Sequence, residues 1–103
     1  MRTDIQTVLT GTGLPVTYSH YKEPQAPPFL TYLGDGQDQF AADNTRYAFA
    51  PAYTVEYYYT RKSDETEETI EAALLAGGWH FEKGADTWIE SEAVFQIVYY
   101  VRA

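Results

Sequence analysis

The side chains that most often carry catalysis are few in this sequence and lack the spacing that catalysis needs. His20 and His80 are the only histidines, and there is no cysteine to act as a nucleophile or to bind zinc. Neither histidine has a metal-binding partner at motif spacing, and no serine lies in a glycine elbow. His20 falls in a β-prone stretch and His80 lies between two aromatic residues, a setting in which a structural role is the commoner one. We therefore predict that the protein is not an enzyme.

Two further motifs also fail as sites. The stretch 11–13, Gly-Thr-Gly, lacks the remaining glycine and the lysine of a phosphate-binding loop. The stretch from Asp35 onward is rich in oxygen ligands, but the glycine and glutamate positions of a calcium-binding loop counted from Asp35 hold Phe40 and Arg46. The sequence therefore predicts no metal ion and no other cofactor.

Length and charge narrow the class of protein. A chain of 103 residues with 45% hydrophobic residues suits one folded domain spanning 1–103. Its 15 acidic and 7 basic side chains give a net charge of −8, which opposes tight binding to a nucleic-acid backbone. No apolar run has the length of a membrane span and the N-terminus lacks the apolar core of a signal peptide, so neither membrane insertion nor secretion is expected. The absence of cysteine leaves the compartment open.

A strand followed at once by a helix, between Tyr53 and Gly78, organises the chain. The strand is indicated by alternation of inward apolar residues with mostly polar ones, and its inward residues are Tyr53, Val55, Tyr57 and Tyr59. The helix is indicated by apolar residues at helical spacing, which are Ile70, Ala73 and Leu74, with four acidic residues turned away, which are Asp64, Glu65, Glu68 and Glu71. Asp64 and Glu67 resemble a capping box, and the glycines at 77–78 supply the stop.

The flanking segments complete the expected fold. Ile5, Val8 and Leu9 predict a short first helix, with Thr3 or Asp4 as N-cap. The stretches 16–21 and 29–33 are expected to be adjacent antiparallel strands, and 79–83 is expected to form a hairpin with 87–90. Residues 93–101 form the last strand. We predict an α+β fold, a two-layer sandwich in which a mostly antiparallel sheet of four to six strands carries two helices on one face.

Two features predict contacts with other molecules. The last strand is apolar on both faces, with Ile97 and Tyr99 on one and Val98 and Tyr100 on the other, so it needs a cover on each side. Helices would cover one side, and another subunit is a candidate for the second. Leu75 lies outside the apolar stripe of its helix and is expected to be exposed, either as an ordinary surface leucine or as a subunit contact.

The stretch from Asp35 to Arg46 has turn formers and amides around one aromatic residue, and it predicts a long loop. Loops of this length in compact domains often carry function. The loop is the predicted docking segment, and its candidate contact residues are Asp38, Gln39, Phe40, Asp43, Asn44 and Arg46.

Six segments carry a resemblance to known proteins: LPVTY at 14–18, PPFLTY at 27–32, ADN at 42–44, YTVEYYYTRK at 53–62, ETIE at 68–71 and ESE at 90–92. They resemble a family of small proteins encoded among the head and tail genes of long-tailed bacteriophages, specifically the tail-terminator or tail-completion group, and the resemblance covers almost the whole chain. It implies an α/β sandwich that assembles as a homo-hexameric ring, caps the tail tube and forms part of the head-tail joint. It implies no catalytic residues.

The resemblance also implies the partners and the location. The ring would contact the tail-tube protein and a head completion or connector protein, while DNA passes through its acidic lumen without specific binding. The protein would lie at the head-proximal end of the tail in the virion, and in the host cytoplasm during assembly. Two alternatives remain at this stage. One is an acidic inhibitor that mimics DNA, for which Glu65, Glu67, Glu68 and Glu71 would be the exposed carboxylates, and the other is a different head-tail connector of the adaptor or stopper type.

Overall fold

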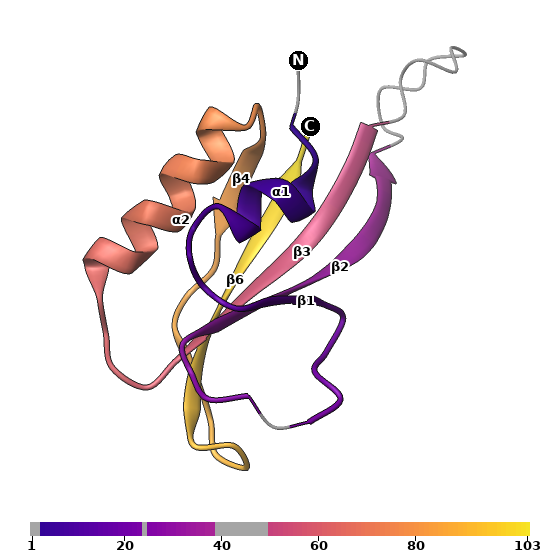
Figure 1. Ribbon diagram of the computed structural model, residues 1–103. Coiled ribbons are helices and arrows are strands. Elements are labelled where there is room, and N and C mark those ends of the chain that lie inside the picture. Colours follow the sequence, from indigo (N-terminus) through magenta and orange to yellow (C-terminus); the bar gives the residue numbers. More distant parts are fainter. Residues whose placement is uncertain (1–2, 24, 39–49) are drawn as a thin grey trace.

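A mixed, mostly antiparallel sheet with two helices forms the structure, a computed structural model that describes residues 3–23, 25–38 and 50–103 (Figure 1). The elements in chain order are α1 (Ile5–Thr10), β1 (Val16–Tyr18), β2 (Phe29–Asp38), β3 (Ala50–Tyr59), α2 (Asp64–Ala76), β4 (His80–Lys83), β5 (Thr87–Ile89) and β6 (Val94–Arg102). The strand order is β1-β2-β3-β6-β4, and β5 also pairs with β6. The predicted α+β fold with a mostly antiparallel sheet is confirmed.

The core lies between the helices and one face of the sheet. Alternate residues of β3 and β6, including Val55, Tyr57, Ile97 and Tyr99, are buried in one cluster with side chains from both helices. The helical contribution to that cluster is Ile5, Val8 and Leu9 from α1 and Ile70 and Leu74 from α2. The strand period of two and the helical spacing of three and four therefore meet in one core, as the sequence predicts.

The helix ends follow the sequence signals, with one correction. Asp4 caps α1, since its carboxylate accepts a hydrogen bond from Thr7 N at 3.3 Å. The N-cap of α2 is Ser63, whose Oγ accepts from Thr66 N at 3.2 Å. The predicted capping box of Asp64 and Glu67 is wrong, because the turn begins one residue earlier and Glu67 points into the protein instead of back to the cap.

The prediction of two antiparallel strands at 16–21 and 29–33 is also wrong. β1 is shorter than predicted and pairs in parallel with β2, in the register Val16 to Leu30 and Tyr18 to Tyr32. The chain leaves β1 at Ser19, whose φ of 68° ends the extended conformation. The connection 19–28 is long enough to return the chain to the starting end of β1, and parallel pairing requires such a crossover.

The predicted loop from Asp35 to Arg46 is wrong for its first residues, which belong to a strand, and residues 39–46 lie outside the described residues. β2 continues to Asp38 and pairs there with Ala50 of β3, with an irregularity in the ladder between Gly34 and Gln37. Pro51 does not interrupt β3. Its carbonyl accepts from Ala103 N at 3.2 Å, so its nitrogen also faces the end of β6, and the pairing with β2 loses no hydrogen bond. A proline is tolerated in a strand where its missing N–H has no ladder partner to lose.

The predicted hairpin between 79–83 and 87–90 does not form. β4 and β5 instead pair one after the other with the same edge of β6, as shown by Phe81 opposite Val101 and Trp88 opposite Phe95. Between them Gly84 N donates to Val98 O at 2.7 Å, and a Cβ at this glycine would lie 3.0 Å from that oxygen. The glycine therefore allows a close backbone approach to β6 where the sequence suggested a turn.

Candidate functional site

The two faces of β6 differ sharply in how they are covered. Ile97, Tyr99 and Val101 are buried beneath the helices, whereas Tyr100 on the other face is 51% exposed and Val98 is half-buried. The face opposite the helices is therefore the less covered one, in line with the prediction that a lone chain leaves part of this strand open.

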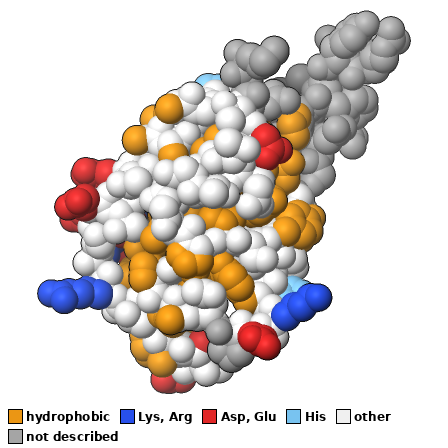
Figure 2. All heavy atoms as spheres, viewed as in Figure 1, with side chains coloured by type: hydrophobic (Ala, Val, Ile, Leu, Met, Phe, Trp, Pro, Cys, Tyr) orange, Lys and Arg blue, Asp and Glu red, His pale blue; other side chains and the backbone are white. Residues whose placement is uncertain are grey.

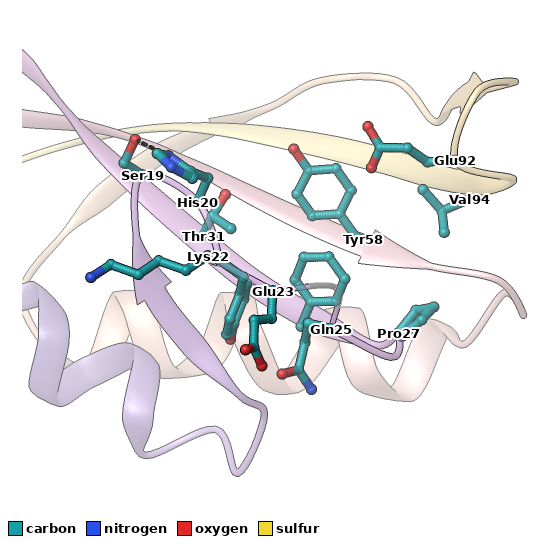
Figure 3. A pocket seen from close by; sticks show the side chains of 12 residues that line it. Ser19, His20, Lys22, Glu23, Gln25, Pro27, Thr31, Tyr58, Glu92 and Val94 are labelled. Carbon is teal, nitrogen blue, oxygen red and sulfur yellow. Dashed lines mark hydrogen bonds between the residues drawn. The ribbon is translucent and has the colours of Figure 1, made fainter.

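The chain itself covers one end of this second face. The connection between β1 and β2 carries Tyr21, whose ring packs edge-on against Phe29, and Phe29 in turn stacks on Tyr58 of β3 with centroids 4.8 Å apart. A hollow of about 620 Å³ lies between this connection and the sheet. Figure 3 shows it bounded by residues 19–23, Gln25 and Pro27 on one side and by Tyr58, Glu92 and Val94 on the other. Sequence reasoning gave no sign of this hollow.

The polar groups around the hollow are mixed in charge. Its lining includes Lys22, Glu23 and Glu92 together with His20, whose Nδ1 lies 3.1 Å from Ser19 Oγ. Burial, followed by the hydrogen bond to Glu56, raises the pKa of Tyr58 to about 12, so its hydroxyl stays protonated at neutral pH. Within the described part of the chain no three potential metal ligands gather, either here or around the exposed His80.

Leu75 and Trp88 are among the large side chains that remain open at the surface on the helix side. Leu75 is 59% exposed on the outer side of α2, as predicted, while its role as a ring contact remains a prediction. Trp88 is 47% exposed at the end of a series of rings that runs from Tyr59 through Phe95. Figure 2 shows hydrophobic side chains gathered over the middle and lower part of this face of the molecule, below α1. Trp88 was not among the predicted contact residues. Its position in a short strand between two turns was the sequence signal that could have indicated its exposure.

The predicted docking segment follows the far end of the β2–β3 pair. Asp38 is the last residue of β2, paired with Ala50. The other candidate residues, Gln39, Phe40, Asp43, Asn44 and Arg46, lie outside the described residues.

A cluster of charges fixes the N-terminal half of α2 to the sheet. Glu67 is only 2% exposed, and its carboxylate lies 2.7 Å from both Lys62 Nζ and Lys83 Nζ. Lys83 Nζ also lies 2.8 Å from Glu71, and Lys62 Nζ lies 3.0 Å from Asp86. Of the four carboxylates considered for DNA mimicry, Glu67 and Glu71 thus point inward and are neutralised, which corrects the expectation that they are displayed outward.

The cluster shifts the titration of its members. Burial raises the pKa of the Glu67 carboxyl, but the contacts from Lys62 and Lys83 outweigh it, so the pKa lies below its ordinary value. The pKa of Asp86 is lowered by the hydrogen bond that the Tyr59 hydroxyl donates to it and by the contact with Lys62. Both carboxyls are therefore ionised at neutral pH. The cluster stabilises the packing of α2 on the sheet, and neither of these two carboxyls carries a proton that it could donate.

A comparison with solved structures finds the same fold elsewhere. A chain of the "Virion of native gene transfer agent (GTA) particle" superposes with a TM-score of 0.56, covering 97% of this chain and 84% of that chain at 15% sequence identity. The fold is therefore shared over nearly the whole length. No model of a known protein family and no curated protein matches the sequence. Among the described residues, neither helix has the length and apolar character needed to cross a membrane.

Proposed function

We propose that this chain is a non-enzymatic structural protein of a phage-like virion, and that it acts as a tail terminator. It caps the last ring of the tail tube, stops tail growth and forms part of the head-tail joint. The observation that carries the proposal is the shared fold with a chain of a gene transfer agent virion over 97% of this chain. The resemblance of its sequence segments to tail-terminator proteins supports the specific role.

The distribution of apolar surface supports assembly into a ring. A closed ring needs two different patches on each subunit, one for each neighbour. Leu75 on α2 and Trp88 on β5 are 59% and 47% exposed and lie on different elements, so they are the candidate members of two such patches. A homo-hexamer, as in the tail-terminator group, would use such patches together with the segment that follows Asp38 for contacts with the tail tube and the head connector.

The acidic character suits this role. A net charge of −8 would let DNA pass through the lumen of a ring without adhering to it. The DNA-mimic alternative is less favoured, because Glu67 and Glu71 are occupied by Lys62 and Lys83 and are not displayed along the helix.

Light scattering during size-exclusion chromatography tests the proposal. The purified chain is measured alone and with the tail-tube protein of the same virion. A ring, alone or on the end of the tube, is expected. A chain that stays monomeric and leaves the tubes unchanged contradicts the proposal, and inhibition of a DNA-binding protein by such a monomer would favour the mimic.

Leu75→Asp sharpens the same experiment. Leu75 is 59% exposed, so Leu75→Asp removes little packing, but it places a carboxylate in the last turn of α2 against the helix dipole. We therefore expect the unfolding free energy to fall by no more than about 1 kcal/mol while ring assembly is impaired. Thr69→Asp, at another exposed position of α2, is the matched control and should assemble normally. A loss of several kcal/mol on Leu75→Asp would instead identify Leu75 as a core residue.

A further inference from the structure

Three strands form a regular grid on the sheet face opposite the helices. The register between β2, β3 and β6 sets three rows across this face: Phe29, Tyr58 and Gln96; Thr31, Glu56 and Val98; Leu33, Thr54 and Tyr100. Glu56 lies at the centre, with one neighbour on each side along its own strand and across the sheet. We call these nine residues the Glu56 grid.

Two hydrogen bonds from neighbouring side chains hold the Glu56 carboxylate in place. Thr31 Oγ1 donates to Glu56 Oε1 at 3.1 Å, and the Tyr58 hydroxyl donates to the same oxygen at 2.8 Å. Tyr58 is itself positioned by Gln96, whose Nε2 donates to the phenol oxygen at 3.0 Å. Thr31 is 4% exposed, so one of the two donors is a buried group with a fixed position. Both donors converge on Oε1, and the carboxylate is thereby oriented with Oε2 as its remaining acceptor.

No cation neutralises this carboxylate within the described residues. Glu56 makes no ion pair there, and none of the other eight grid residues is basic. Arg102, one row beyond Tyr100, pairs with Glu82 at 2.8 Å, and Lys62 and Lys83 pair with Glu67 on the helix side. Lys22 lines the hollow beside Thr31 and Tyr58 but forms no ion pair with Glu56, so a half-buried negative charge remains in the middle of this sheet face among the described residues.

The surface around the carboxylate is largely apolar. Leu33 is 48% and Tyr100 is 51% exposed, and Val98 lies between Glu56 and the edge strand. On the other side Phe29 stacks on Tyr58. A charge ringed by apolar and aromatic side chains gains most from an opposite charge when a partner covers the ring and excludes water.

We propose that the Glu56 grid is a docking site for a partner protein that inserts a lysine or arginine side chain, with its cationic head on Glu56 Oε2. The stem of that side chain and the apolar residues beside it cover Leu33, Val98 and Tyr100. The net charge of −8, and the absence of a basic residue from the grid, make a basic partner the complementary one for this face. The proposal rests on the geometry of this face and not on the proposed role as a tail terminator.

Amide NMR of the full chain tests the site directly. The probe is the peptide acetyl-Leu-Arg-Leu-amide, and the control peptide replaces arginine with citrulline, which keeps the shape and removes the charge. With the arginine peptide we expect saturable shifts of the backbone amides of Thr31, Glu56 and Val98. With the citrulline peptide at the same concentrations we expect binding at least about tenfold weaker, which corresponds to 1.4 kcal/mol.

Three variants complete the test. Glu56→Gln retains an oxygen that can accept from Thr31 and Tyr58, so the variant should fold normally. Its affinity for the arginine peptide should be at least about tenfold lower. Leu33→Ser, at an exposed position, should also weaken binding. Glu68→Gln removes the same charge from the outer side of α2 and should bind as the unaltered chain does.

Several results would overturn the proposal. These are equal binding of the two peptides, unchanged binding by Glu56→Gln, or no shifts at the grid up to the solubility limit of the arginine peptide. Shifts at the grid that grow with protein concentration alone, and vanish in Glu56→Gln, would assign the site to a second copy instead. Ring assembly is a separate measurement, so a failure here and a failure of the terminator proposal are distinguishable.

Discussion

Replacing the buried glutamate of α2 is the most direct test of the physical account of this fold. Glu67→Gln removes one negative charge that sits between Lys62 Nζ and Lys83 Nζ, each 2.7 Å away. Glutamine fills the same space, so packing is retained and the change isolates the charge. The helix dipole works in the same direction, because Glu67 belongs to the first turn of α2.

The expected loss follows from the neighbours that remain. Breaking a fully buried ion pair costs about 3–5 kcal/mol. Here the lysines are 50% and 36% exposed, and each keeps a second carboxylate, Asp86 for Lys62 and Glu71 for Lys83. Both lysines can therefore be partly compensated, and we expect a loss of about 2 kcal/mol in the free energy of unfolding.

Urea denaturation followed by circular dichroism measures this loss. Glu68→Gln, an exposed neighbour on the same helix, is the control and should change the unfolding free energy by less than about 0.5 kcal/mol. If Glu67→Gln unfolds at the same urea concentration as this control, the cluster does not stabilise the fold and the reasoning fails.

Three further predictions concern titration and packing. Because the pKa values of Glu67 and Asp86 are lowered in the folded protein, the unfolded chain binds more protons than the folded one in acid. The free energy of unfolding should therefore fall as the pH drops below about 4. Thermal melts measured over this pH range should show a smaller fall in Glu67→Gln. The pKa of Tyr58 is raised to about 12, so its contribution to the free energy of unfolding should be complete below pH 10 and lost as the pH rises through 12. Absorbance titration of tyrosinate, measured together with unfolding, can follow this loss. Gly77→Ala would place a Cβ 2.5 Å from Val8 Cγ2 and should lower the unfolding free energy by about 1–3 kcal/mol. Gly11→Ala, at an exposed position, is the control and should be tolerated. Equal melting temperatures for the two variants would contradict this prediction.

The parts of the fold that depend on local periodicity were predictable. The alternation of Tyr53 to Tyr59 and the spacing of Ile70 and Leu74 correctly placed β3 and α2, because burial on one face imposes those periods on any sequence. Glu67 shares the helix face of Ile70 and Leu74, at three and seven residues before them, so its burial was also visible in principle. Its identity as a charged residue hid that signal.

The parts that depend on long-range pairing were not predictable. Whether 16–18 runs parallel to β2 depends on where the ten residues of the connection travel, and no local pattern records this. The hairpin expected between β4 and β5 fails because both find a longer partner in β6. For the site, the exposure of Leu75 followed from its helix, but the central position of Glu56 needed the register of three strands. Its place opposite Thr31 and Val98 could not be read from one strand alone.

The two tryptophans of this chain lie in opposite environments, and this makes them a matched pair of optical reporters. Trp79 is 3% exposed, and its indole N–H donates to Thr3 O at 2.8 Å, so its emission should be blue-shifted and shielded from acrylamide until the N-terminal segment and α2 separate. Trp88 is 47% exposed, so its emission should be red-shifted and readily quenched. With one tryptophan replaced at a time by phenylalanine, the unlabelled protein reports separately on the integrity of its interior and on anything that settles over Trp88.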